Sequence, residues 1–278
     1  MNKFFINVLK PIKYFAIYAL LLLFMSPFFM VLLNSLKTDA EFIASPLSLP
    51  AHFSLDNFVK AFQAMHFVNS FMNSLIVTVA GTLLVVILSA MTAHRFVRHK
   101  SKFNKIFFYV MVATMIIPFQ AIMIPLVGIY GGKLDLLGNK WILIYMCIGF
   151  GVSQAVFMYS GFIKSIPAEL EEAALIDGCN KLQMFFFVVW PLLKTITVTL
   201  VIMEVLWLWN DYLLPVLVLG SSFKQLTLPL STFSFYGSYS ADYTLIMAAL
   251  LMTMTPVIIM YIFLQRHIIA GIVNGAIK

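Results

Sequence analysis

The chain has 278 residues, of which 62% are hydrophobic and only 10% are charged. Soluble domains carry about a quarter charged residues, so a water-soluble fold of this length could not bury so much apolar side chain. The net charge of +7 alone would allow nucleic-acid binding, but the positions of the basic residues favour orientation in a membrane, with the lipid bilayer as the partner.

Six apolar stretches are each long enough to cross a bilayer, which takes about 20 residues. They lack the alternation typical of barrel strands, so all six are predicted to be helices of an all-α membrane protein with one transmembrane domain, residues 1–278. The first is longer than the apolar core of a signal peptide, and no A-x-A-like cleavage site follows it. The expected spans are 12–36, 69–94, 106–130, 141–163, 195–219 and 243–264.

The basic residues are unevenly distributed among the segments that connect these spans. Thirteen of the 18 Lys and Arg residues lie in the N-terminal arm, the second connection, the segment 164–194 and the C-terminal tail. Positively charged loops stay in the cytoplasm, so this set, both termini included, is predicted to be cytoplasmic. The basic sequence HRFVRHKSKFNK, residues 94–105, is interpreted as a topology signal with some headgroup contact, and His94 and His99 are expected to be solvated.

A short polar helix is predicted within segment 164–194, between the fourth and fifth spans. Pro167 suits the first turn of a helix, because its missing N–H would be unpaired there anyway. The first two turns carry three carboxylates, which complement the positive end of the helix dipole. These are Glu169, Glu171 and Glu172.

One face of this predicted helix is thin, since it carries two alanines and lets another protein approach closely. At helical spacing the face consists of Leu170, Ala173, Ala174 and Asp177. Gly178 permits a C-terminal cap with positive φ, and a second helix is predicted before Pro191. On composition alone, a surface helix that merely links two spans explains the segment equally well.

The sequence EAALIDG, with a Phe and a Pro at fixed distances after it, resembles the EAA motif of ATP-binding-cassette importer permeases of the carbohydrate, maltose-transport type. The matching positions are Glu172, Ala173, Ala174, Asp177, Gly178, Phe185 and Pro191. Cys179 and Trp190 depart from the motif, and both are apolar substitutions. The resemblance extends along nearly the whole chain through NSLK at 34–37, NS at 73–74, WND at 209–211 and the tail sequences QRHIIAG and NGAIK.

This resemblance implies a bacterial inner-membrane permease subunit that forms half of the pathway for an oligosaccharide or disaccharide. Its EAA helix would dock an ATPase subunit and couple ATP hydrolysis to movement of the spans. The implied partners are a second homologous permease, two ATPase subunits and an extracytoplasmic sugar-binding protein. The chain lacks the P-loop sequence G-x-x-x-x-G-K-[ST], so it is expected to be no enzyme and to hold no cofactor, with ATP and Mg²⁺ bound in the partner ATPase.

The predicted fifth span contains ionisable and aromatic residues that are candidates for the substrate pathway. An ionised carboxylate at mid-bilayer costs about 2.5–3.5 kcal/mol, so Glu204 should face the bundle interior or water. Trp207, Asn210 and Asp211 lie nearby, and aromatic rings beside hydrogen-bonding groups suit sugar binding. A structural hydrogen bond for Glu204, and membrane-interface positions for the aromatic residues, are equally open interpretations.

Other functions remain open at this point. A secondary transporter would use Glu204 for proton coupling, and a permease of the same superfamily would carry a non-sugar solute. A membrane-embedded enzyme would need a cluster of ionisable residues at one membrane face, and none is visible. Cys147 and Cys179 lie in or near apolar runs and are expected to be inert thiols, and no spacing typical of a metal site occurs.

Overall fold

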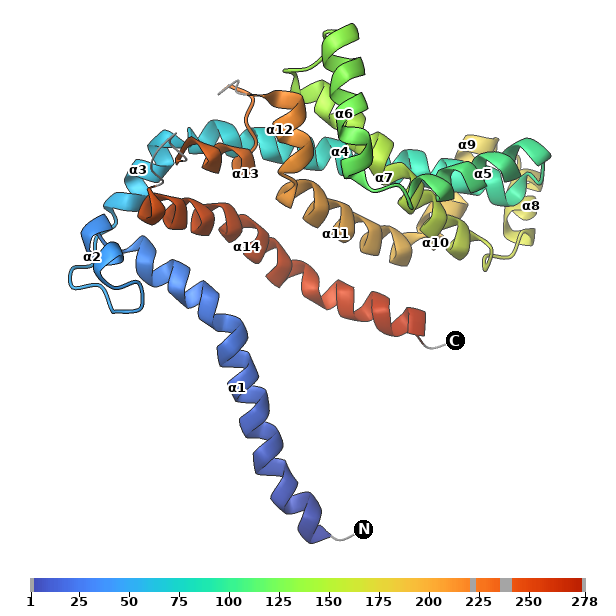
Figure 1. Ribbon diagram of the computed structural model, residues 1–278. Coiled ribbons are helices and arrows are strands. Elements are labelled where there is room, and N and C mark those ends of the chain that lie inside the picture. Colours follow the sequence, from blue (N-terminus) through green and yellow to red (C-terminus); the bar gives the residue numbers. More distant parts are fainter. Residues whose placement is uncertain (1–2, 221–223, 236–241, 277–278) are drawn as a thin grey trace. The chain divides into compact units, whose positions relative to one another are not determined.

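A computed structural model describes residues 3–220, 224–235 and 242–276 (Figure 1). All regular structure within these ranges is helical, so the predicted all-α class is confirmed for them. The chain divides into two compact units, which are described separately. Unit 1 comprises Met1–Phe67 and Thr232–Pro256, and unit 2 comprises Val68–Ser231 and Val257–Lys278.

Four helical segments in the described chain are long and apolar enough to cross a membrane by themselves. They are Lys10–Ser35 in α1 (Lys3–Ser35), α4 (Phe67–Arg98), α7 (Lys140–Ile163) and Tyr243–Phe263 in α14 (Tyr243–Ala276). Two further pairs of helices qualify only if each bent pair counts as one span. The structure thus provides four to six candidate spans, all of which overlap predicted ones.

The predicted span 106–130 is interrupted by a sharp bend. Helix α5 (Lys102–Thr114) ends there, and α6 (Phe119–Val127) with the π-helix η1 (Gly128–Lys133) continues at an angle of 98°. Pro118 lies at the break in an extended conformation, with ψ of 138°. Proline lacks a backbone donor and disfavours helical geometry in the residue before it, so the helix cannot run through this point.

The predicted span 195–219 is also interrupted. Helix α11 (Lys194–Asn210) ends at Asp211, whose ψ of 128° is extended, and α12 (Leu213–Leu219) begins after it. The Asp211 carboxylate accepts hydrogen bonds from the backbone N–H groups of Leu213 and Leu214, at 3.1 and 3.4 Å. It therefore satisfies donors at the start of α12, as capping side chains do. Before α11, the segment Lys181–Leu192 is bent by 80° from it.

Unit 1 contains α1, the short helices α2 (Asp39–Ala44) and α3 (Asp56–Ala64), the 3₁₀-helix η3 (Thr232–Phe235) and the first part of α14. Hydrogen bonds fix the loop after α1. The buried Lys37 ammonium donates to the carbonyls of Ser45 and Pro46. Asn57 donates its amide to the carbonyls of Ser35 and Lys37. These bonds satisfy a buried cation without a carboxylate partner among the described residues, so they order the loop.

Unit 2 is built on close packing of α11 against α4 and α7. A Cβ atom added at Gly81 of α4 would lie 2.9 Å from Leu208 of α11. One added at Gly151 of α7 would lie 3.0 Å from a carboxyl oxygen of Glu204. The two glycines thus let the helices approach more closely than any side chain would permit.

Asn73 and Ser74 anchor the segment before α13 (Leu228–Ser231) to α4. Asn73 donates to the carbonyls of Lys224 and Leu226, and the Leu228 N–H donates to the Ser74 hydroxyl at 2.7 Å. The two residues of the NS sequence, noted for its resemblance to the permease pattern, therefore hold the segment before α13 against α4.

Candidate functional site

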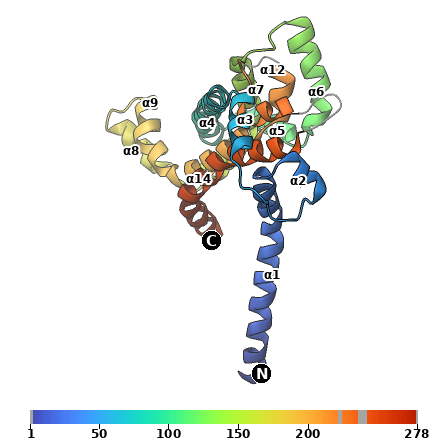
Figure 2. The same ribbon diagram turned by 90° about the vertical axis from the view of Figure 1, so that its left-hand side faces the viewer.

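The predicted helix–glycine–helix unit is present between α7 and α11. Helix α8 (Glu169–Ile176) is followed by α9 (Lys181–Met184), the π-helix η2 (Phe185–Val189) and α10 (Trp190–Leu192). Figures 1 and 2 both draw α8 and α9 as neighbouring short helices. The chain therefore makes a compact turn here before α11 begins.

Gly178 ends α8 with φ of +89°, as predicted. Its N–H donates to Leu175 O, and the Cys179 N–H donates to Ala174 O at 3.0 Å. This pair of bonds is the Schellman arrangement, which glycine allows because it has no Cβ to clash at positive φ. Asn180 then starts α9 with a capping box to Gln183. Both helix ends at this turn are thus fixed by hydrogen bonds.

Glu171 fastens α8 to the end of α4. Its carboxylate accepts a hydrogen bond from Arg98 Nε at 2.7 Å and lies 2.8 Å from His94 Nε2. The Glu171 side chain is only 9% exposed, and Arg98 also donates through Nη2 to the carbonyl of Ile166 at 2.9 Å. Charge-assisted bonds of this length and burial are among the strongest that side chains form. They tie the first turn of α8 to residues more than seventy positions earlier in the chain.

The expectation that His94 is solvated is wrong. The His94 side chain is 14% exposed, and its ring also lies edge-on to Phe185 with 5.4 Å between the ring centroids. His99 is exposed, in keeping with the prediction. Partial desolvation, followed by the nearby charges of Arg95 and Lys181, lowers the pKa of His99 from its ordinary value.

The two alanines of the motif do not share one exposed face. Ala173 is exposed, but Ala174 is buried and belongs to the apolar cluster that also contains Met184 and Phe185. Because residues adjacent in a helix point about 100° apart, one alanine faces outward while the other packs inward. The thin exposed face is therefore narrower than predicted.

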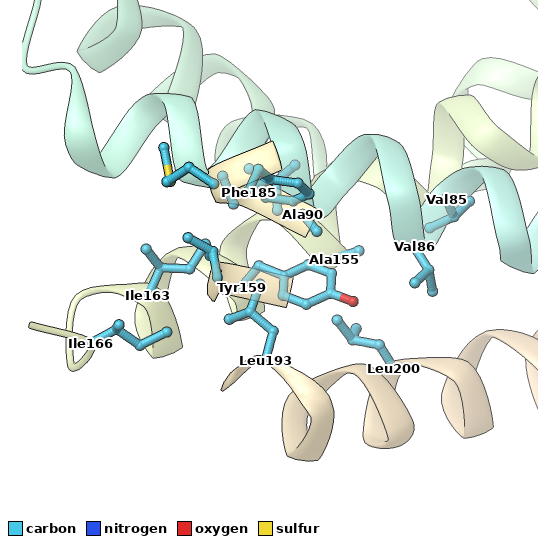
Figure 3. Close-up of a cluster of buried hydrophobic side chains, with 14 of the residues drawn as sticks. Val85, Val86, Ala90, Ala155, Tyr159, Ile163, Ile166, Phe185, Leu193 and Leu200 are labelled. Carbon is cyan, nitrogen blue, oxygen red and sulfur yellow. The ribbon is translucent and has the colours of Figure 1, made fainter. Parts of the chain in front are cut away.

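Within unit 2, the apolar cluster attaches the helix–glycine–helix segment to α4, α7 and α11. Figure 3 shows Tyr159 of α7 among Ala90 of α4 and Leu193 and Leu200. The Tyr159 hydroxyl donates to Thr197 Oγ1 at 2.9 Å, so its polar end is satisfied within the cluster. Burial of these side chains stabilises the attachment of α8, α9 and η2 to α4, α7 and α11.

The other predicted coupling residues lie at different depths. Glu172, Asp177, Gly178 and Pro191 are exposed, whereas Phe185 is only 3% exposed. Of these residues, Glu172 and Phe185 line a cavity of about 430 Å³, whose other side chains come mainly from the end of α4, from α8 and from α9. The same segment exposes large apolar side chains, and these are Leu170, Leu175, Ile176, Leu182 and Phe187. The outer surface thus combines apolar area with negative charge.

The predicted pathway residues of α11 do not face in one direction. Glu204 is 4% exposed, and its Oε2 atom has no hydrogen-bond partner in the described chain. Trp207 and Asn210 are exposed, and the Asn210 amide donates to the carbonyl of Leu206. Asp211 caps α12 as described above. Of these four residues in the described chain, only Glu204 is thus a buried polar group with an oxygen atom that has no hydrogen-bond partner.

Comparison of the sequence with known protein families finds a match. Residues 85–274, more than half of the chain, match the model of the "binding-protein-dependent transport system inner membrane component". The chain belongs to this family. It is an integral protein of the bacterial inner membrane and a transport component, not an enzyme. The match includes α8, α9 and the arginine and histidine that hold Glu171.

Two relatives cover nearly the entire chain. The chain is 41% identical to the probable starch degradation products transport system permease protein AmyC of Thermoanaerobacterium thermosulfurigenes, over 98% of each chain. It is 37% identical to the melibiose/raffinose/stachyose import permease protein MelC of Bacillus subtilis, over 91% of each. A solved bacterial ABC transporter for import of the acidic polysaccharide alginate contains a chain with the same fold. That likeness has a TM-score of 0.78 at 20% identity and covers 94% of this chain and 96% of the other.

Sequence reasoning did not select the link formed by Glu171, His94 and Arg98. His94 and Arg98 are four residues apart, so they share one face at the end of α4 and can grip one carboxylate. That spacing is a usable signal for the basic half of the site. Nothing in the sequence around Glu171 distinguishes it from Glu172, which was selected through the motif.

Proposed function

We propose that this chain is the permease subunit of an ATP-driven importer of an oligosaccharide or disaccharide. The full-length similarity to permeases named for starch products and for melibiose, raffinose and stachyose supports the proposal. The apolar helices supply the membrane-embedded part, and the chain has no P-loop of its own, so a partner subunit hydrolyses ATP with Mg²⁺. An extracytoplasmic binding protein delivers the sugar.

The proposal includes a six-span topology in one permease domain with both termini in the cytoplasm. In this arrangement α5 with α6 and η1 forms the third span, α11 with α12 forms the fifth, and the connections that carry most of the Lys and Arg residues lie inside. Segment 164–194 is cytoplasmic in this arrangement. A second, homologous permease completes the translocation pathway.

Helix α8 docks an ATPase subunit in this proposal. Its exposed surface offers Glu172, Ala173 and Asp177 beside Leu175 and Ile176, a mixture of charge and apolar area that suits a protein interface. The hydrogen-bonded cap at Gly178 and the buried face of α8 keep the helix rigid. A rigid helix transmits a push from the partner to the membrane bundle instead of absorbing it.

A crosslinking experiment tests the docking. With Ala173→Cys, a bifunctional thiol reagent should join the permease to the co-expressed ATPase subunit. Ala174→Cys should not crosslink, because that position is buried. Equal crosslinking from both positions, or none from either, would contradict the proposed interface.

Uptake measurements test the transport function itself. The reconstituted complex with its binding protein should accumulate labelled oligosaccharide only with ATP inside the vesicles that hold the ATPase subunits. Glu204→Gln should alter this uptake without loss of assembly if the carboxyl belongs to the pathway with Trp207, Asn210 and Asp211. Uptake by the purified chain alone, driven by a pH gradient, would instead favour a proton-coupled transporter.

A further inference from the structure

A second cavity, of about 650 Å³, opens between the end of α4, the start of α5 and α7. It is separate from the cavity beside α8, although Arg98 lines both. Its wall is strongly basic. The cationic lining residues are Arg98, Lys100, Lys102, Lys105 and Lys164, and no Asp or Glu lines it.

The lysines of this wall have no carboxylate partner. Neither ion pair found in the described residues involves Lys100, Lys102, Lys105 or Lys164. All four lysines are exposed, and like charges around one cavity repel one another, so an anion bound there would be attracted by all of them. The cavity therefore has the charge of an anion-binding site.

The wall also contains a buried hydroxyl without a partner. Ser160 of α7 lines the cavity and is 2% exposed, and its Oγ atom makes no hydrogen bond in the part of the chain that the structure describes. An unsatisfied buried polar group costs free energy, about 1–3 kcal/mol. The Oγ atom itself is almost fully enclosed, so a rotation of the side chain toward the cavity would let an acceptor oxygen of a ligand satisfy it.

The basic loop of the cavity is held in a fixed conformation. Asn104, 8% exposed, donates its amide to the carbonyl of His99 at 2.6 Å, and its N–H donates to the hydroxyl of Ser101 at 3.1 Å. Ser101 thereby caps the N-terminus of α5. The cations on both sides of this cap are presented by an ordered backbone, which lowers the entropic cost of binding a ligand.

The other side of the cavity is apolar and continues onto exposed apolar side chains. Phe96, Phe108 and Tyr109 line it, and Phe103 and Phe107, on the same helix α5 as Phe108 and Tyr109, are exposed. In an integral membrane protein, exposed apolar residues such as these face lipid. A ligand that fits both sides carries a phosphate and an acyl chain.

We propose that this cavity binds the phosphate headgroup of an anionic phospholipid, with the acyl chains lying along α5. Basic pockets between transmembrane helices are suited to such headgroups. Arg98 uses Nε and Nη2 to hold Glu171 and Ile166, and its guanidinium also borders the cavity. A bound phosphate would thus stabilise the same arginine that fastens α8 to α4.

The test uses the purified full-length chain in detergent micelles, titrated with phosphatidylglycerol or with phosphatidylcholine and followed by native mass spectrometry. The chain should bind the first phosphatidylglycerol at least tenfold more tightly than phosphatidylcholine. The double variant Lys105→Gln/Lys164→Gln should bind phosphatidylglycerol roughly thirtyfold more weakly, at about fivefold for each lysine. The matched control Lys13→Gln/Lys194→Gln removes the same charge elsewhere and should change the affinity less than twofold.

Further measurements distinguish binding at this cavity from a general attraction of anions to a basic surface. Ser160→Ala should not lower the melting temperature of the lipid-free chain, since the hydroxyl has no partner there, and should weaken phosphatidylglycerol binding about tenfold through loss of one hydrogen bond to a charged group. Equal affinity for the two lipids, equal losses in both double variants, or an unchanged Ser160→Ala affinity would overturn the assignment. Displacement of the lipid by equimolar glycerol 3-phosphate would also overturn it, because the site would then recognise a free phosphate.

Discussion

Replacement of Glu171 by alanine should detach α8 from α4, whereas replacement of Glu172 should not. The two residues are neighbours in the first turn, so both substitutions change helix propensity and the dipole interaction equally. Only Glu171 carries the bonds to Arg98 and His94. The difference between the two variants therefore isolates the ion-pair link.

The magnitude follows from burial. Removing one partner of a buried ion pair costs about 3–5 kcal/mol, because the other charge stays behind without compensation. The Arg98 side chain is 17% exposed, so some water reaches it and the low end, about 3 kcal/mol, applies. At about 1.4 kcal/mol per factor of ten, this is roughly a hundredfold increase in opening of the helix.

Hydrogen–deuterium exchange of the purified chain measures this opening directly. In the Glu171→Ala variant, the backbone amides of α8 should exchange roughly a hundredfold faster, while those of α7 keep their protection. The Glu172→Ala variant should stay within about threefold of the parent chain. Equal exchange in the two variants would refute the assignment of Glu171 as the fastening residue.

Three further predictions concern glycine geometry and histidine charge. Gly178→Leu should destabilise the turn by about 1–2 kcal/mol, because Gly178 has a φ of +89° that a leucine adopts only with strain. The substitution should also uncouple ATP hydrolysis from uptake in the reconstituted complex. Normal transport by this variant would contradict the proposed coupling role of the turn. Gly151→Ala should lower thermal stability by about 1–3 kcal/mol, since the new Cβ would press on the Glu204 carboxyl at 3.0 Å, whereas Gly149→Ala, with open space around it, should not. In NMR spectra His99 should titrate below its ordinary pKa of 6.5, because partial desolvation and neighbouring cations disfavour its charged form. The contribution of neutral His99 to folding stability should therefore be lost as the pH falls below 6.5. A raised pKa would contradict the proposed effect of desolvation and cations.

Much of the fold was predictable because the controlling signals are local. The apolar runs predicted α1, α4, α7 and α14, since a bilayer demands long helices of apolar residues. Gly178 was predicted correctly as the end of α8, because only a residue without Cβ takes a positive φ readily. These features depend on a few neighbouring residues, which the sequence shows directly.

The breaks in the third and fifth predicted spans required knowledge of the surroundings. Proline interrupts some membrane helices and only kinks others, depending on whether neighbours satisfy the freed backbone groups. Pro118 lies in the break between two helices as the N-cap of α6, whereas Pro27 and Pro256 lie inside α1 and α14. Asp211 stops α11 because its side chain caps the next helix. Hydrophobicity alone does not separate these cases.

The inward direction of Glu171 follows from tertiary contacts and not from the helix itself. Both it and Glu172 complement the helix dipole, and the motif drew attention to the exposed one. Burial of Glu171 is favourable only where a cation meets it, and that cation comes from α4, more than seventy residues earlier. Long-range pairing of this kind leaves no periodic pattern in the sequence.

The two attachments of α8 differ in their physical character, and this difference bears on how a docked partner would move the bundle. The ion pair at Glu171 is short and directional, and it leads to α4 alone. The apolar contacts of Ala174 lead to the cluster shared by α4, α7 and α11, and such close-packed contacts resist compression but carry no direction of their own. A push on the exposed face near Ala173 would therefore shift the helices together through the cluster, while a pull would be transmitted to α4 through Arg98. Loss of the ion pair should thus weaken transmission of the pull to α4, whereas loss of the apolar contacts should weaken transmission of the push.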